Sequence, residues 1–134
     1  MAKIKHIAMI CMDPNKLADF YCDVFDMKVQ LRRNGNVFLT DGYLNVALLA
    51  QTAEGKPNGL NHFGFHIENA DVVAERMKKW NVVGPVKRPA DRTYAETRGT
   101  DPEGNNFDLT VGGFERSRQP DVVELQRQTE PTTA

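Results

Sequence analysis

The chain has 134 residues, enough for one folded domain with its own core. Its composition, 40% hydrophobic and 26% charged, is typical of globular proteins. A formal net charge of -1 argues against a nucleic acid or an anionic membrane as partner. The longest apolar stretch, 46–50, is too short to span a bilayer, and the first residues lack the apolar core of a signal peptide. We therefore expect a cytoplasmic protein.

The two halves of the chain repeat one pattern. The segment HIAMICMD at 6–13 aligns without a gap to HFGFHIEN at 62–69. Each half opens with an apolar run that begins in histidine and continues into a helical pattern. The repeat predicts a single domain with four parts: module one at about 4–50, a linker at 51–61, module two at about 62–113, and a polar tail at 114–134.

Module one opens with an apolar run at 4–12 that predicts a buried strand. Asp13 is a suitable N-cap and Pro14 a suitable first residue for the helix that follows, and Asp26 is expected to end it. Three short β-type stretches come next, separated by Asn-Gly-Asn and Asp-Gly turns. They lie at 28–33, 37–41 and 43–50.

Module two follows the same order. A strand at 62–68 precedes a helix at about 70–80, with Val73, Met77 and Trp80 on one face. Strands are expected near 82–88, 93–100 and 105–112, with Asp-Pro-Glu-Gly forming the last turn. Each module is therefore βαβββ.

Strand alternation gathers polar side chains on one side of the predicted sheet. His62, Gly64 and His66 share one face of their strand, and the phenylalanines between them share the face expected to pack on a helix. His6 holds the matching place in the first strand. Asp108 likewise lies opposite the apolar residues of the last strand.

Two histidines at matching positions of a repeat would be brought together by pseudo-twofold symmetry. With one carboxylate they form the 2-His-1-carboxylate set, which leaves open positions on Fe(II) or Mn(II) for substrate and oxygen. With zinc the same set would give a Lewis acid or an activated water. A histidine in a strand is more often a hydrogen-bonded structural residue, so the pairing of His6 with His62 carries this prediction.

Three segments resemble the vicinal oxygen chelate superfamily, which includes glyoxalases, bleomycin-resistance proteins and extradiol dioxygenases. They are KHIAMICMDPNKLADFYCDVFDMK, NHFGFHIENAD and TDPEGNNFDLTV, and the resemblance covers about 4–113. It implies an α+β fold in which two tandem βαβββ modules form an eight-stranded, cup-like mixed sheet with flanking helices. It also implies one divalent metal per chain and a homodimer.

By position, the resemblance implies that His6, His62 and Asp108 are the metal ligands. The acid in the last strand is commonly glutamate in the family, so the shorter Asp108 is a departure. Members of the glyoxalase I type have a fourth ligand on the last strand of the first module, where Asn45 is the only polar side chain nearby. This departure favours the three-ligand types.

The resemblance implies an enzyme that chelates two adjacent oxygens of a small-molecule substrate. An extradiol-type dioxygenase, a lyase or an isomerase would fit, with Fe(II) or Mn(II) as the first expectation and Zn(II) or Ni(II) as alternatives. A fosfomycin-type antibiotic-resistance transferase is one rival, although Ala8 lacks the hydroxyl group expected there. A protein of the same fold that binds a small molecule or antibiotic without metal is the other.

Further polar residues are candidates for catalysis. His66 could act as a general base or a hydrogen-bond donor to substrate, because imidazole titrates near neutral pH. Tyr94, Glu96 and Arg98 alternate along one predicted strand and face either the site or solvent, with solvent as the main expectation. Asn106 and Thr110 flank Asp108 in the last strand and are candidates to orient its carboxylate.

Overall fold

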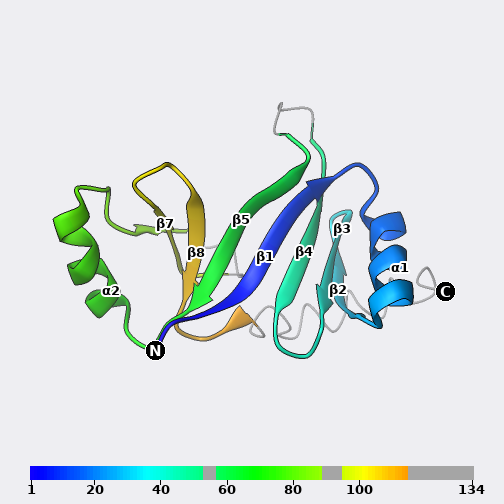
Figure 1. Ribbon diagram of the computed structural model, residues 1–134, viewed down its shortest axis with the longest axis horizontal. Helices are drawn as coiled ribbons and strands as arrows, with labels where there is room; N and C mark the ends of the chain where they lie inside the picture. The colour runs from blue at the N-terminus through cyan, green and yellow to red at the C-terminus, as the bar shows by residue number, and fades with distance from the viewer. Residues whose placement is uncertain (53–56, 89–94, 115–134) are drawn as a thin grey trace. The chain divides into compact units, whose positions relative to one another are not determined.

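The computed structural model describes residues 1–52, 57–88 and 95–114, and its strands and helices follow the predicted βαβββ order twice (Figure 1). The elements of the first half are β1 (Lys3–Cys11), α1 (Pro14–Phe25), β2 (Lys28–Arg33), β3 (Asn36–Thr40) and β4 (Asn45–Ala50). Those of the second half are β5 (Gly59–His66), α2 (Ala70–Met77), the 3-10 turn η1 (Lys78–Trp80), β6 (Val86–Lys87), β7 (Thr97–Thr100) and β8 (Asn106–Thr110).

The strands form one mixed eight-stranded sheet in the order β2-β3-β4-β1-β5-β8-β7-β6, which confirms the predicted α+β class. β5 and β8 run parallel, whereas β2–β3, β3–β4, β6–β7 and β7–β8 are antiparallel. By its contacts the chain divides into two compact units. One joins Met1–His6 to the described residues from His62 onward, and the other is built from Ile7–Asn61. β1 therefore contributes its first residues to one unit and the rest to the other.

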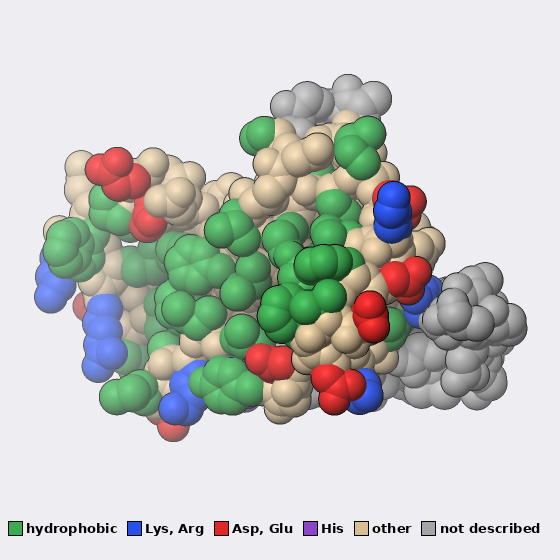
Figure 2. All heavy atoms as spheres, turned by 45° about the vertical axis from the view of Figure 1, so that its right-hand side comes forward, with side chains coloured by type: hydrophobic (Ala, Val, Ile, Leu, Met, Phe, Trp, Pro, Cys, Tyr) green, Lys and Arg blue, Asp and Glu red, His purple; other side chains and the backbone are tan. Residues whose placement is uncertain are grey.

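The unit built from Ile7–Asn61 packs α1 onto its strands. Asp13 accepts a hydrogen bond from the backbone N of Lys16, Pro14 begins the helix, and Asp26 ends it in the left-handed conformation, as predicted. The buried residues of this core are Ala18, Val37, Leu39 and Leu48. Aromatic side chains remain on the outer side of α1, where Phe20 and Phe25 are more than half exposed. Figure 2 shows hydrophobic side chains over much of the face that it displays.

The turn between β2 and β3 takes the conformation that its sequence favours. Asn34 and Gly35 both have positive φ, at 53° and 82°, which is the requirement of a two-residue hairpin turn. The next connection is wider than a tight hairpin. There Asp41 accepts hydrogen bonds from the backbone N atoms of Tyr43 and Leu44, so β4 begins only at Asn45.

The other unit departs from the predictions in α2 and β6. Asn69 caps α2, but the α-helix stops at Met77, and Trp80 beyond it is 62% exposed instead of packing on the sheet. β6 contains two residues, where a strand over 82–88 was predicted. Pro85 directly precedes it and has no N–H to donate to a neighbouring strand, which explains the late start.

β8 is placed by its two neighbours and by the turn before it. Phe63 and Gly64 of β5 lie opposite Phe107 and Asp108 of β8 in parallel register. In the preceding turn, the Asp101 carboxylate accepts hydrogen bonds from the backbone N atoms of Glu103 and Asn105 and from the Asn105 side chain. None of the helices in the described part of the chain has the length and apolar character needed to cross a membrane.

Candidate metal centre

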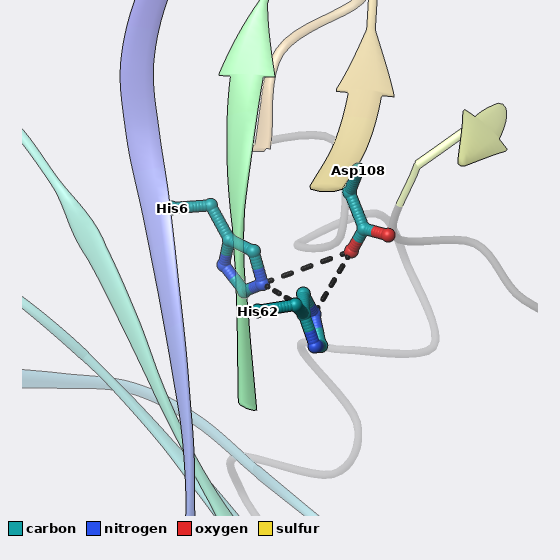
Figure 3. A group of neighbouring side chains, drawn as sticks. All are labelled: His6, His62 and Asp108. Carbon is teal, nitrogen blue, oxygen red and sulfur yellow. Dashed lines mark hydrogen bonds and ion pairs between the residues drawn. The ribbon is translucent and has the colours of Figure 1, made fainter. Parts of the chain in front are cut away.

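Three strands bring together His6, His62 and Asp108, which all belong to one unit, as Figure 3 shows. They come from β1, β5 and β8. The Nε2 atoms of the two histidines lie 3.4 Å apart. Oδ2 of Asp108 lies 3.1 Å from Nε2 of His62 and 3.8 Å from Nε2 of His6. The structure thus brings together the three residues that the sequence analysis grouped, and their role as metal ligands stays a prediction.

The spacing of the three atoms fits a metal ion of ordinary size. A circle through points separated by 3.1, 3.4 and 3.8 Å has a radius of about 2.0 Å, and zinc lies about 2.0–2.2 Å from histidine nitrogen and carboxylate oxygen. Two imidazoles and one carboxylate are also the donor types used by iron and manganese sites with open positions. This group can therefore hold a divalent metal.

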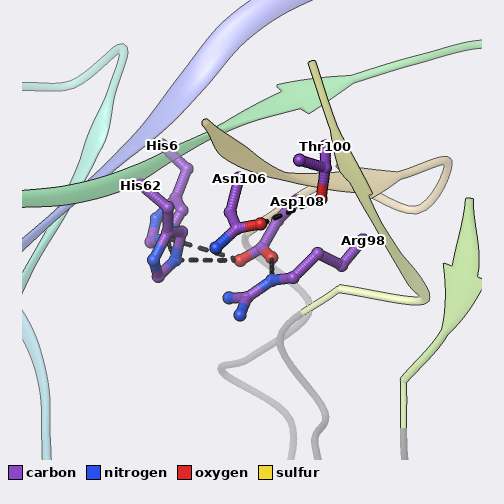
Figure 4. A network of polar contacts seen from close by, with 6 residues as sticks. All are labelled: His6, His62, Arg98, Thr100, Asn106 and Asp108. Atoms are coloured by element: carbon purple, nitrogen blue, oxygen red, sulfur yellow. Dashed lines mark hydrogen bonds and ion pairs between the residues drawn. The ribbon is translucent and has the colours of Figure 1, made fainter. Parts of the chain in front are cut away.

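Burial and a neighbouring arginine set the charge of Asp108. The side chains of His6, His62 and Asp108 are only 1%, 8% and 5% exposed. Burial by itself raises the pKa of the Asp108 carboxyl, but the hydrogen bond and charge of His62, followed by those of Arg98, lower it to about 2. Nε of Arg98 donates to Oδ1 of Asp108 at 2.9 Å, and Figure 4 shows the guanidinium beside the carboxylate. Asp108 is thus an anion with Oδ2 directed to the histidines.

Strand register explains why Arg98 meets Asp108. The antiparallel pairing of β7 with β8 places the two residues directly opposite each other. Side chains opposite each other in an antiparallel pair lie on the same face, so the Arg98 side chain shares the face of Asp108. Arg98 also lies opposite Val86 of β6, so it stands on an inner strand of the sheet.

Gly64 and Phe114 pack against His6. The ring of Phe114 stacks on the imidazole of His6, with centroids 4.8 Å apart and planes at 17°. A Cβ on Gly64 would lie 2.6 Å from Cζ of Phe114 and 3.1 Å from Cβ of His6, so only glycine fits there without a shift. Phe114, the first residue of the predicted tail, is 2% exposed.

The three candidate catalytic residues have different surroundings. Nε2 of His66 lies 3.0 Å from the carbonyl oxygen of Val111. Glu96 accepts a hydrogen bond on each oxygen, from Oγ1 of Thr110 and from the backbone N of Val111, both at 2.6 Å. Tyr94 lies outside the described residues. Catalytic roles for these residues stay predictions.

The remaining candidates bond to groups other than Asp108. Asn106 accepts from Oγ1 of Thr100, and Thr110 donates to Glu96. Asn45, considered for a fourth ligand position, is buried in the other unit and donates to Oε1 of Gln30 at 2.6 Å. The residue that holds Asp108 is instead Arg98, for which sequence reasoning favoured a solvent-facing position.

Sequence reasoning also missed Phe114, because it marks the point at which the chain becomes polar. A large aromatic residue directly after Gly112-Gly113 was the available signal. Gly113 has a φ of 89°, and its backbone N donates to Oγ1 of Thr110. Phe114, directly after this turn, stacks on His6.

Solved structures of low sequence identity share the fold. LapB, a 2,3-dioxygenase from Pseudomonas sp. KL28, is 14% identical with a TM-score of 0.64, over 81% of this chain and 40% of that one. Methylmalonyl-CoA epimerase from Mycobacterium tuberculosis is 15% identical with a TM-score of 0.62, over 79% of this chain and 85% of that one. A variant of the Streptomyces coelicolor epimerase is 21% identical with a TM-score of 0.59, over 81% and 97%. No curated protein matches the chain.

A family model matches residues 3–109, which include all three members of the candidate metal centre. Its description is the glyoxalase/bleomycin resistance protein/dioxygenase superfamily. The match spans well over half of the chain and covers the first module and most of the second. The chain belongs to the glyoxalase/bleomycin resistance protein/dioxygenase superfamily.

Proposed function

We propose that this protein is a metal-dependent enzyme in which His6, His62 and Asp108 bind one divalent ion. The observation that carries the proposal is the convergence of three buried donor atoms with separations of 3.1, 3.4 and 3.8 Å. The substrate is a small molecule with two adjacent oxygen atoms. A bound ion would supply Lewis acidity to those two oxygens, at the positions that three protein ligands leave open.

The side chains around the site prepare it for that role. Arg98 holds Oδ1 of Asp108, which leaves Oδ2 for the ion and fixes the plane of the carboxylate. Phe114 covers one face of the His6 ring and prevents it from turning. Because these residues are nearly all buried, charges at the site interact more strongly than they would in water.

For the reaction class, we propose a dioxygenase, a lyase or an isomerase. The similar structures include proteins named as a 2,3-dioxygenase and as methylmalonyl-CoA epimerases, and at 14–21% identity they support the fold alone. The donor set suits Fe(II) or Mn(II) for a dioxygenase or an isomerase. It suits Zn(II) or Ni(II) for a lyase or an isomerase.

The test is metal content in wild type and in matched variants. We expect about one metal ion per chain in protein purified anaerobically without a metal-affinity step, and a large loss in His6→Ala, His62→Ala and Asp108→Ala. His66→Ala is the control, because His66 lies on the same strand as His62 but contacts the carbonyl of Val111. Full metal occupancy in the three ligand variants would refute the assignment.

The identity of the metal directs the activity assays. Iron or manganese calls for oxygen-consumption measurements with catechols and for proton-exchange measurements with enolisable acids. Zinc or nickel calls for lyase and isomerase assays. A protein that contains no metal, and takes up none when Fe(II), Mn(II) or Zn(II) is added, would be better explained as a metal-free small-molecule binding protein.

A further inference from the structure

The Arg98 guanidinium is only partly engaged by Asp108. Its bond to the carboxylate uses Nε, at 2.9 Å from Oδ1. Among the residues that the structure describes, the two terminal nitrogens of Arg98 have no hydrogen-bond or ion-pair partner. The Arg98 side chain is 28% exposed, whereas that of Asp108 is 5% exposed. One edge of the guanidinium is therefore committed to Asp108, and the side chain as a whole stays partly exposed.

The charges of the site do not balance without a ligand. Asp108 and Arg98 contribute one negative and one positive charge, and histidines that bind a metal through Nε2 are neutral. A divalent ion would leave a net charge of about +2 in a largely buried group of residues. Unbalanced buried charge is costly, so a ligand that contributes negative charge would bind favourably there.

We propose that Arg98 binds an anionic group of the substrate through its terminal nitrogens, so that the substrate is a small acid whose carboxylate lies next to a second, metal-binding oxygen. Compounds with a hydroxyl or oxo group on the carbon next to a carboxylate have this chemistry. A guanidinium presents paired N–H donors that match the oxygens of a carboxylate. Arg98 then has two tasks: its Nε orients Asp108, and its free edge selects an acid.

This proposal rests on the metal site described above and names the substrate class for it. Figure 4 shows the arrangement on which it depends: Arg98 reaches Asp108 from β7, and the rings of His6 and His62 lie on the other side of the carboxylate.

The experiment measures the binding of two bidentate ligands by calorimetry. Oxalate carries two negative charges, and glycolamide offers a hydroxyl and a carbonyl oxygen without charge. Wild type, Arg98→Gln and Arg98→Lys are first titrated with Mn(II) and with Zn(II), and ligand binding is then measured at saturating metal. Arg76→Gln, which removes a charge from an exposed position on α2, controls for the overall change in charge.

We expect Arg98→Gln to lower oxalate affinity by roughly 10- to 100-fold, because hydrogen bonds between charged groups are lost. Glycolamide affinity should change by less than about threefold at the same metal saturation, since its oxygens carry no charge for Arg98 to bind. Arg98→Lys should retain part of the oxalate affinity, and Arg76→Gln all of it.

Equal weakening of both ligands in Arg98→Gln would overturn the proposal, because Arg98 would then act only through Asp108. Unchanged oxalate binding in that variant would also overturn it, as would a metal-loaded wild type that binds neither ligand. A wild-type protein that takes up no metal would instead refute the proposed metal centre itself, and the metal titration separates that result from the others.

Discussion

Replacing Gly64 by alanine would place a methyl group between His6 and Phe114. The added Cβ would lie 2.6 Å from Cζ of Phe114, 3.1 Å from Cβ of His6 and 3.2 Å from Cδ2 of His6. Ordinary contact begins at about 3.4 Å, so both neighbours have to move. His6 is 1% exposed and Phe114 2% exposed, and neither has open space around it.

The cost follows from two opposing effects. Overpacking a filled core destabilises the folded state by about 1–3 kcal/mol. The lower entropy of the unfolded alanine chain returns about 0.4–1 kcal/mol. We therefore expect Gly64→Ala to lower the free energy of unfolding by roughly 1–2 kcal/mol, measured by urea denaturation of metal-free protein. Displacement of His6 should also weaken metal binding by about tenfold.

Gly99→Ala is a matched control. Its Cβ would lie 2.5 Å from Cε1 and Cζ of Phe107, a clash as severe as the one at Gly64. Phe107 packs near Phe63 and Phe65, on the face of the sheet away from the metal centre. We expect a similar loss of stability in this variant and a much smaller change in metal affinity.

A double-mutant cycle tests the packing itself. Phe114→Ala removes the closest contact, so Gly64→Ala should cost less in that background than in wild type. The reasoning would be refuted if Gly64→Ala were as stable as wild type and bound metal equally well. It would also be refuted if Gly99→Ala weakened metal binding as strongly as Gly64→Ala does.

Three further predictions concern ionisable residues. Because the pKa of Asp108 is lowered to about 2 in the folded protein, metal-free wild type should be more stable than Asp108→Asn at neutral pH, by an amount on the order of 2 kcal/mol. That advantage should be complete above the unfolded pKa near 4 and disappear as the pH falls toward 2, and a pH-independent difference in urea titrations would contradict it. Glu96→Ala removes the acceptor of two 2.6 Å hydrogen bonds and should destabilise the fold by about 1–3 kcal/mol. Its metal affinity should stay within about threefold of wild type by calorimetry, because Glu96 holds the end of β8 and not a metal ligand. Burial raises the pKa of both Cys11 and Cys22, so iodoacetamide should modify them more slowly than free cysteine at neutral pH, and rapid labelling of the folded protein would contradict this.

The histidines of the metal centre could be predicted from the sequence because a repeat relates them. His6 and His62 begin the same apolar run in each half, and both residues belong to the unit that holds the site. Asp108 followed from simple alternation along a strand, although the burial of β8 does not alternate, since Asp108, Leu109 and Thr110 are all buried. The first inference needs the repeat, and the second needs only the alternation of side chains along one strand.

Arg98 and Phe114 required information that local periodicity does not contain. The face that Arg98 occupies depends on the register of β7 against β8, which is set by the turn at 101–105. Phe114 contacts His6 after a turn in which Gly113 has a positive φ, a conformation that periodicity does not predict. The same limit applies to α2 and β6, whose lengths were predicted from periodicity. The α-helix ends at Met77, earlier than predicted, and β6 begins only after Pro85.

The polar groups around β8 fall into two kinds, and the contrast favours a metal at one of them. Thr110 donates to Glu96 and accepts from the backbone N of Gly113, so that network satisfies itself. In the second group, formed by His6, His62 and Asp108, the two imidazole Nε2 atoms lie 3.4 Å apart and both face one carboxylate oxygen. Two N–H groups cannot both point at each other, so at least one Nε2 must present a lone pair toward the same region as the carboxylate. A neutral imidazole has one N–H, so hydrogen bonds within the group satisfy only some of these three atoms, whereas a cation about 2.0 Å from each would satisfy all of them.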